Sequence, residues 1–434
     1  MSQSGLTKPF PRGEFSLAAA PRESGRATDG AKREMRSAAD VSDVFFAFLR
    51  LGLSAFGGPV AHLAYFRQAF VARRAWLTEP EYADLVALCQ FLPGPASSQV
   101  GFAIGLRRAG LAGALAAWCG FTLPSALLMA ALGLGAGALS GRVGEALVHG
   151  LKLVAVAVVA HALWGMAASL APDLRRRAVA AAAGLTALLL AGPLVQAAAI
   201  GLGAVLGALV LKPQAIEPAA DAQGLRVHAP AWAWAALTIF VLLLALLPLC
   251  ATMTGDQRIA LFDSFYRAGA LVFGGGHVVL PLLEAETVGQ GRVSAETFLA
   301  GYGAAQAVPG PLFTFAAFLG AADGLAGGWG GAAIALVAIF LPGLLLAAGV
   351  APFWAGLRDR SWARAPLMGA NAAVVGLLAA ALIDPVITSA ITGPLDGVIS
   401  LAGFLALQRL RAPALAVVAG VAVAGMAVRL AAGL

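Results

Sequence analysis

Long apolar runs separated by short polar stretches occupy the chain from about residue 41 to its end. They form a first set of six, one solitary run, and a second set of six. Several approach the ~20 residues that a helix needs to cross a bilayer. The pattern predicts an all-helical, polytopic membrane protein, with runs at 44–63, 82–106, 111–137, 144–170, 178–192, 194–211, 232–252, 262–283, 296–320, 328–350, 366–383, 392–408 and 413–433.

Composition supports this class, because 60% of the 434 residues are apolar and only 12% are charged. A soluble enzyme, a nucleic-acid binder and a disulfide scaffold are thereby excluded. An intramembrane enzyme is disfavoured, since no HExxH and no readable Ser/His or Cys/His pairing is present, and the lack of a Walker-type loop disfavours ATP-driven transport. We expect no cofactor and no metal. The net charge of +7 is explained by Lys and Arg in cytoplasmic loops rather than by nucleic acid.

Charge and proline divide the chain into four parts. Residues 1–40 are polar and predict a disordered basic cytoplasmic tail. Residues 41–211 form a first repeat, 212–261 a linker with one transmembrane helix, and 262–434 a second repeat.

An internal duplication relates the two repeats. Offsets of 216 to 218 align eleven residues in order, which is too many for chance. The first-copy residues are Arg50, Gly52, Phe56, Gly57, Gly58, Gln90, Pro93, Gly94, Pro95, Phe102 and Pro124, and they recur as Arg267, Gly269, Phe273, Gly274, Gly275, Gln306, Pro309, Gly310, Pro311, Phe318 and Pro342, the last at an offset of 218.

The number of intervening spans predicts that the two repeats face opposite ways. Seven apolar runs separate the two starts, and five remain if 44–63 and 82–106 are re-entrant hairpins. Both numbers are odd, so inversion holds either way. The basic loop that carries Arg67, Arg73 and Arg74 would stay inside with hairpins and lie outside with full crossings. The positive-inside rule therefore favours hairpins.

Broken backbone is expected twice in each repeat. Gly57-Gly58 and Gly274-Gly275 interrupt apolar runs, and so do Pro93-Gly94-Pro95 and Pro309-Gly310-Pro311. At membrane depth such breaks are tolerated where they line a cavity, and in transporters they mark substrate sites. Pro95 and Pro311 suit the first turn of a new half-helix, whose N-terminus favours an anion. Kinks for helix packing are the alternative explanation.

Two arginines inside apolar runs strengthen the anion hypothesis. Arg50 and Arg267 lie inside apolar runs at equivalent positions, where a charged group usually faces a cavity or a partner. With two half-helix ends they would supply about +3 of charge, enough to offset a dianion. Snorkelling to the interface is the competing explanation. Neutral donors beside the breaks are Gln90, Gln306, Ser97, Ser98 and Thr314, each of which could instead pack between helices.

Four residues are candidates for proton coupling: His277, His62, Glu81 and Glu284. A buried histidine is more often a satisfied core group, and acids after the first run of each copy more often solvate loops.

These motifs resemble the chromate ion transporters of the long, two-domain type. The resemblance rests on Phe48–Gly58, Gln90–Pro95 and their echoes Phe273–His277 and Gln306–Pro311, and it covers residues from about 41 to 434. It implies an inner-membrane carrier, with its N-terminus in the cytoplasm, that exports chromate, confers resistance and is driven by the proton motive force. Sulfate would be the competitor, and a sulfate or other oxyanion porter on the same fold is the alternative. Gly/Ala-rich stretches would permit tight packing within the chain or in a homodimer.

Overall fold

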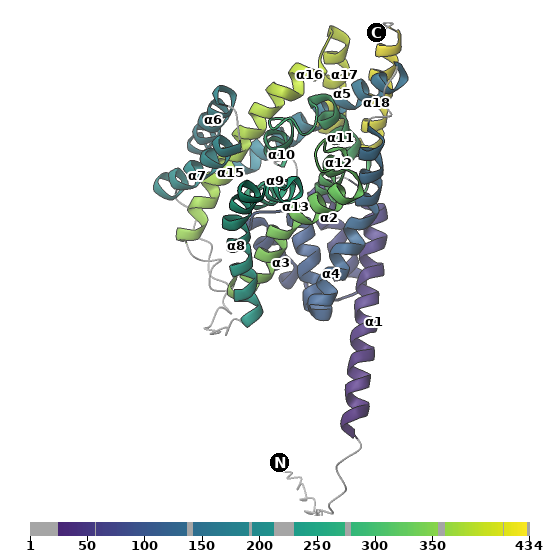
Figure 1. Cartoon of the computed structure of the whole chain (residues 1–434), viewed down its shortest axis with the longest axis vertical. Helices are drawn as coiled ribbons and strands as arrows, with labels where there is room; N and C mark the ends of the chain where they lie inside the picture. The colour runs from purple at the N-terminus through teal and green to yellow at the C-terminus, as the bar shows by residue number, and fades with distance from the viewer. Residues whose placement is uncertain are drawn as a thin grey trace, which may run out of the picture.

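The protein is helical throughout the residues that the computed structural model describes, namely 25–56, 58–136, 142–190, 193–211, 230–273, 279–354, 361–410 and 412–431 (Figure 1). The first copy contains α1 (Gly25–Ser54), α2 (Gly58–Phe66), the π-helical η1 (Arg67–Arg73), α3 (Glu79–Phe91), α4 (Ala96–Leu134), α5 (Arg142–Leu170), α6 (Leu174–Leu189) and α7 (Pro193–Val210). The solitary run forms α8 (Ala231–Thr254). The second copy contains α9 (Gln257–Leu271), α10 (Val279–Thr287), α11 (Ala295–Ala307), η4 (Leu312–Thr314), α12 (Phe315–Ala322), α13 (Gly328–Val350), η5 (Ala351–Phe353), α15 (Ser361–Ala381), η6 (Leu382–Ile387), α16 (Thr388–Ala390), α17 (Pro394–Gln408) and α18 (Ala414–Ala431).

Six of these helices are long and apolar enough to cross a membrane. The structure therefore supports the predicted all-helical, polytopic class. α1 begins at Gly25, so residues 25–40 are helical where the sequence predicted a disordered tail, and residues 1–24 lie outside the described residues. In Figure 1 this part of α1 extends away from the bundle.

The chain reverses direction between α1 and α2. Phe48 of α1 lies against Phe66 and Phe70, with ring centroids 5.4 and 4.7 Å apart. One turn nearer the start of α1, Asp43 accepts a 2.7 Å bond from Arg74. The run 44–63 is thus a helical hairpin that reverses after Ser54 and whose base is held by an ion pair.

A second hairpin follows, with Pro93-Gly94-Pro95 at its turn. Its outgoing arm is α3 and its returning arm is the first part of α4, because Arg107 pairs with Glu81 near the start of α3. α4 itself has two arms, since Ala109 and Gly110 leave helical geometry, Gly110 at φ 62°. The polar stretch that separates the predicted apolar runs 82–106 and 111–137 lies at this reversal.

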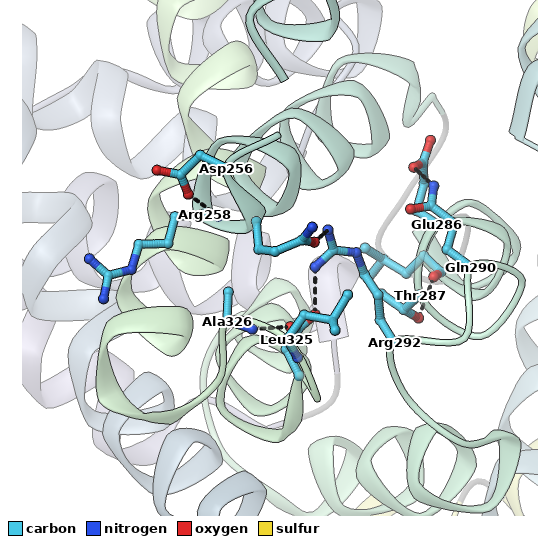
Figure 2. Close-up of polar contacts among 11 residues, drawn as sticks. Asp256, Arg258, Glu286, Thr287, Gln290, Arg292, Leu325 and Ala326 are labelled. Atoms are coloured by element: carbon cyan, nitrogen blue, oxygen red, sulfur yellow. Dashed lines mark hydrogen bonds and ion pairs between the residues drawn. The ribbon is translucent and has the colours of Figure 1, made fainter. Parts of the chain in front are cut away.

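The second copy repeats both hairpins. Arg267 of α9 forms an ion pair of 2.8 Å with Glu286 of α10. The ring centroids of Tyr302 on α11 and Phe315 on α12 are 5.7 Å apart. At the base of the second hairpin, Arg292 donates to Asp323 at 3.0 Å, and Asp323 also accepts the backbone N–H groups of the next turn (Figure 2). The Arg292–Asp323 pair is buried, whereas the ion pairs at the base of the first copy, Arg107–Glu81 and Arg108–Asp40, are partly exposed.

The two copies also exchange their outer helices. α6 and α7 of the first copy pack on α15 of the second, and α17 and α18 of the second pack on α5 of the first (Figure 1). Glycines allow this contact: Gly203 and Gly207 meet Gly369, and Gly150 meets Ala422. The Gly/Ala-rich stretch near 201–207 therefore packs within the chain.

Candidate functional site

The hairpin turns of the two copies meet in reciprocal pairs. Gly94 donates its N–H to the carbonyl of Val272 at 2.7 Å, and Gly310 donates to Ala55 at 2.9 Å. Gly94 and Gly310 occupy equivalent positions in the Pro-Gly-Pro turns, and Ala55 and Val272 are equivalent at the ends of α1 and α9. Each Pro-Gly-Pro turn is therefore bound to the broken helix of the other copy.

Glycine is required at both of these turns. Gly94 has φ +120° and Gly310 has φ +103°, where side chains cause strain. Space is also short, because a Cβ on Gly94 would lie 2.9 Å from Cα of Gly343, and one on Gly310 would lie 2.7 Å from Oγ of Ser125. Gly343 and Ser125 each follow the proline of an equivalent Leu-Pro pair.

The returning arm of the first hairpin begins at this meeting point with buried polar groups. Pro95 is its N-cap and offers no side-chain bond to the free N–H groups. Ser97 contacts Nδ1 of His62 at 3.4 Å, while Nε2 of His62 and Oγ of Ser98 are buried without a partner in the described residues. A helix N-terminus, free N–H groups and unpartnered donors are the features that suit an anion.

Gln99 connects the two copies and was not found by comparing the two repeats in the sequence. Its Nε2 donates to the carbonyls of Pro93 at 2.8 Å and Gly343 at 2.9 Å, and the residue is fully buried. Its equivalent in the second copy is Phe315, so repetition gave no signal. Only its place one turn after Pro95 could have suggested it.

The two arginines have different surroundings. Arg267 bonds Asp263 at 3.0 Å and Glu286 at 2.8 Å, so two carboxylates compensate its charge. Arg50 is exposed on α1, and its guanidinium has no partner among the described residues. Of the two arginines, only Arg50 therefore keeps a positive charge that no carboxylate of the described residues compensates.

The neutral hydrogen-bond donors also differ in their burial and in their partners. Thr314 is buried and donates to the carbonyl of Pro311 at 2.9 Å. Gln306 bonds Tyr302 and keeps Nε2 buried without a partner, whereas Gln90 is exposed on α3. Gly58 begins α2 at φ +75°.

With this geometry established, the family can be identified. The family model described as "Chromate transporter" matches residues 42–208 and again residues 259–426, more than half of the chain. The chain belongs to this family. It is therefore a transporter and not an enzyme, and the predicted resemblance is confirmed. The double match also agrees with the duplication read from the sequence.

Similar proteins carry the same description. The "Chromate transport protein" of Pseudomonas aeruginosa is 29% identical over 83% of this chain and 84% of its own length. The "Probable chromate transport protein" of Synechococcus elongatus is 32% identical over 77% of this chain and 82% of its own. The "Chromate transport protein" of Cupriavidus metallidurans is 28% identical, covering 87% and 91%. No solved structure matches the chain.

The remaining predicted residues of this family member lie apart from the turns or outside the described residues. Glu81 caps α3, because its carboxylate accepts hydrogen bonds from the Thr78 backbone N–H and hydroxyl and also pairs with Arg107. These bonds, chiefly the one from the Thr78 backbone N–H, hold the pKa of Glu81 below its usual range. Glu284 is half-buried on α10. Residues 57 and 274–278, and with them Gly57, Gly274, Gly275 and His277, lie outside the described residues.

Proposed function

We propose that this protein is a secondary active transporter that exports chromate across the inner membrane, driven by the proton motive force, and so confers chromate resistance. Membership of the chromate transporter family and relatives named as chromate transport proteins support it. The observation that carries the proposal is the reciprocal contact of the Pro-Gly-Pro turns, beside which lie the buried α4 N-terminus and a buried Ser98 hydroxyl that has no partner among the described residues.

The proposed substrate site lies where these turns meet. A tetrahedral dianion would accept hydrogen bonds from the first N–H groups of α4 and from Ser97, Ser98 and His62. Arg50 would supply full positive charge, with Gln306 and Thr314 contributed by the second copy. Arg267, whose charge is compensated, would lock α9 to α10 rather than bind the anion directly.

The proposed membrane arrangement follows from the hairpins. With their turns midway across the bilayer and their bases at opposite surfaces, the four hairpins would be re-entrant and the repeats inverted. Reciprocal contacts such as Gly94–Val272 and Gly310–Ala55 are typical of a twofold axis. Five helices separate the hairpins of the two copies (the second arm of α4, then α5 to α8), and this odd number places the axis in the membrane plane.

The membrane potential favours export. Moving one charge through 100 mV is worth about 2.3 kcal/mol, so a dianion leaving a negative cell gains roughly twice that. Proton antiport would add to this gain. Uptake against the same potential would need about three protons per dianion to proceed.

Everted membrane vesicles test the proposal. Energised vesicles containing the protein should accumulate chromate, and an uncoupler should abolish the accumulation. Arg50→Gln should reduce uptake strongly at normal protein level, whereas Arg73→Gln, an exposed arginine in η1, should not. Wild-type uptake by Arg50→Gln would refute the proposed site.

A sulfate or other oxyanion porter is the second candidate. The hydrogen-bond donors around the turns suit any tetrahedral dianion, so geometry does not separate the two. Uptake of labelled sulfate that excess chromate fails to inhibit would favour the second candidate, and chromate uptake that sulfate only partly inhibits would favour the first.

A further inference from the structure

A buried histidine–carboxylate pair joins the two copies away from the hairpin turns. Nε2 of His149 on α5 lies 2.9 Å from Oδ1 of Asp396 on α17, and the two side chains are only 8% and 3% exposed. α5 belongs to the first copy and α17 to the second. In the described part of the chain, none of the groups assigned to anion binding is hydrogen-bonded to this pair.

Hydrogen bonding fixes the roles of the two side chains. Oδ2 of Asp396 accepts the N–H of Thr392 at 2.9 Å, its hydroxyl at 2.8 Å and the N–H of Gly393 at 3.0 Å. With three donors on one oxygen and the imidazole on the other, Asp396 is an ionised acceptor. His149 therefore donates from Nε2, and Nδ1 is the nitrogen that can take up a proton.

The fold does not need a polar pair at this position. The equivalent interface in the other half, between α6 and α15, closes by direct backbone contact of Gly184 and Ala180 with Gly376. Burial of a charged group without a structural requirement is costly and usually has a functional reason.

Charges of both signs occur on α5 and on the elements packed against it. On α5 itself, Glu145 precedes and Lys152 follows His149 by about one turn, and Lys152 lies 3.5 Å from the carbonyl of Ser389. The other elements packed on α5 contribute Glu296 on α11, Asp384 on η6, Arg364 on α15 and Arg429 on α18.

We propose that His149 and Asp396 form the proton-binding site that couples proton entry to anion export. This inference rests on the proposed function and names the residues that the proton motive force acts on. Without the proton the pair carries one negative charge, and with it the pair is a neutral imidazolium–carboxylate contact. Proton binding thus removes net charge from a buried interface and strengthens the contact of α5 with α17. Proton release weakens it, which allows the two halves to move relative to each other.

Two measurements test this site. The first is an NMR titration of the intact protein in detergent micelles, with its five histidines labelled with ¹⁵N. A titrating resonance should vanish in His149→Gln and shift in Asp396→Asn, and absence of any titration at His149 between pH 4 and 10 would overturn the proposal. This measurement needs no substrate, so it decides on proton binding even if the protein does not carry chromate.

The second measurement compares accumulation with exchange in vesicles. Glutamine keeps an N–H donor for Asp396 but cannot titrate, so His149→Gln should lose uncoupler-sensitive accumulation and keep chromate–chromate exchange, and Asp396→Asn should behave alike. The control Glu145→Gln, exposed one turn away, should keep both. The coupling role would be overturned if His149→Gln accumulated chromate as the wild type does, with the same dependence on pH. It would also be overturned if both variants lost exchange at normal protein level. No exchange by the wild type would instead refute the proposed function.

Discussion

Single glycines determine whether the hairpin turns can meet. Gly94→Ala and Gly310→Ala place a Cβ at φ +120° and +103° and against neighbouring atoms, which costs of order 1–3 kcal/mol each. We expect lower melting temperatures in detergent and loss of chromate uptake. Gly420→Ala is the control, because a Cβ there meets nothing within 4 Å. Equal melting temperatures for all three variants would contradict the role of these turns.

Gln99 is the residue-scale link between the copies. Gln99→Leu leaves the carbonyls of Pro93 and Gly343 without their donor, and losing buried partners costs about 1–3 kcal/mol. Thermal unfolding of the purified protein should show this loss, whereas Gln68→Leu, at an exposed site in η1, should stay near the wild-type value. An unchanged melting temperature for Gln99→Leu would mean that the cross-copy bonds contribute nothing to stability.

At the scale of elements, the bases of the hairpins differ between the copies. Arg292 and Asp323 are 4% and 1% exposed, while Arg107 and Glu81 are 53% and 36% exposed. Arg292→Gln leaves a buried carboxylate unpaired and should cost about 3–5 kcal/mol, whereas Arg107→Gln should cost less than about 1 kcal/mol. Double-mutant cycles on thermal unfolding measure both couplings, and equal couplings would refute the difference.

The sequence predicted the breaks and the duplication, but only part of the geometry around them. Pro-Gly-Pro is visible because it recurs, and it is a poor helix interior wherever it lies. The reversal after Ser54 is less visible, because an apolar run of twenty residues has the same pattern as a crossing helix or a hairpin. Only the charges of Arg67, Arg73 and Arg74 favoured the hairpin. Glu286 as a partner of Arg267 was unpredictable, since eighteen residues lie between them in the sequence.

At the scale of the whole molecule, the exchanged outer helices prevent the copies from acting as separate domains. α6 and α7 pack against α15, and α17 and α18 pack against α5. Movement of one copy must therefore displace helices of the other. These interfaces differ between the halves, because α5 and α17 share a buried ion pair while α6 and α15 meet at glycine backbone. The His149–Asp396 pair lies in one of them, which is where a proton could change their relative position.

Inversion of the repeats makes a prediction that a labelling experiment can decide. Leu111 and Leu325 lie at equivalent hairpin bases and are 63% and 60% exposed. In a background lacking Cys89, Cys119 and Cys250, Leu111→Cys and Leu325→Cys should react with a membrane-impermeant maleimide from opposite sides. Because basic residues surround the first base, Leu111→Cys should react only in everted vesicles and Leu325→Cys only in intact cells. Labelling of both from one side would mean parallel repeats. The turns would then not meet midway across the membrane, and the proposed anion site would not lie there.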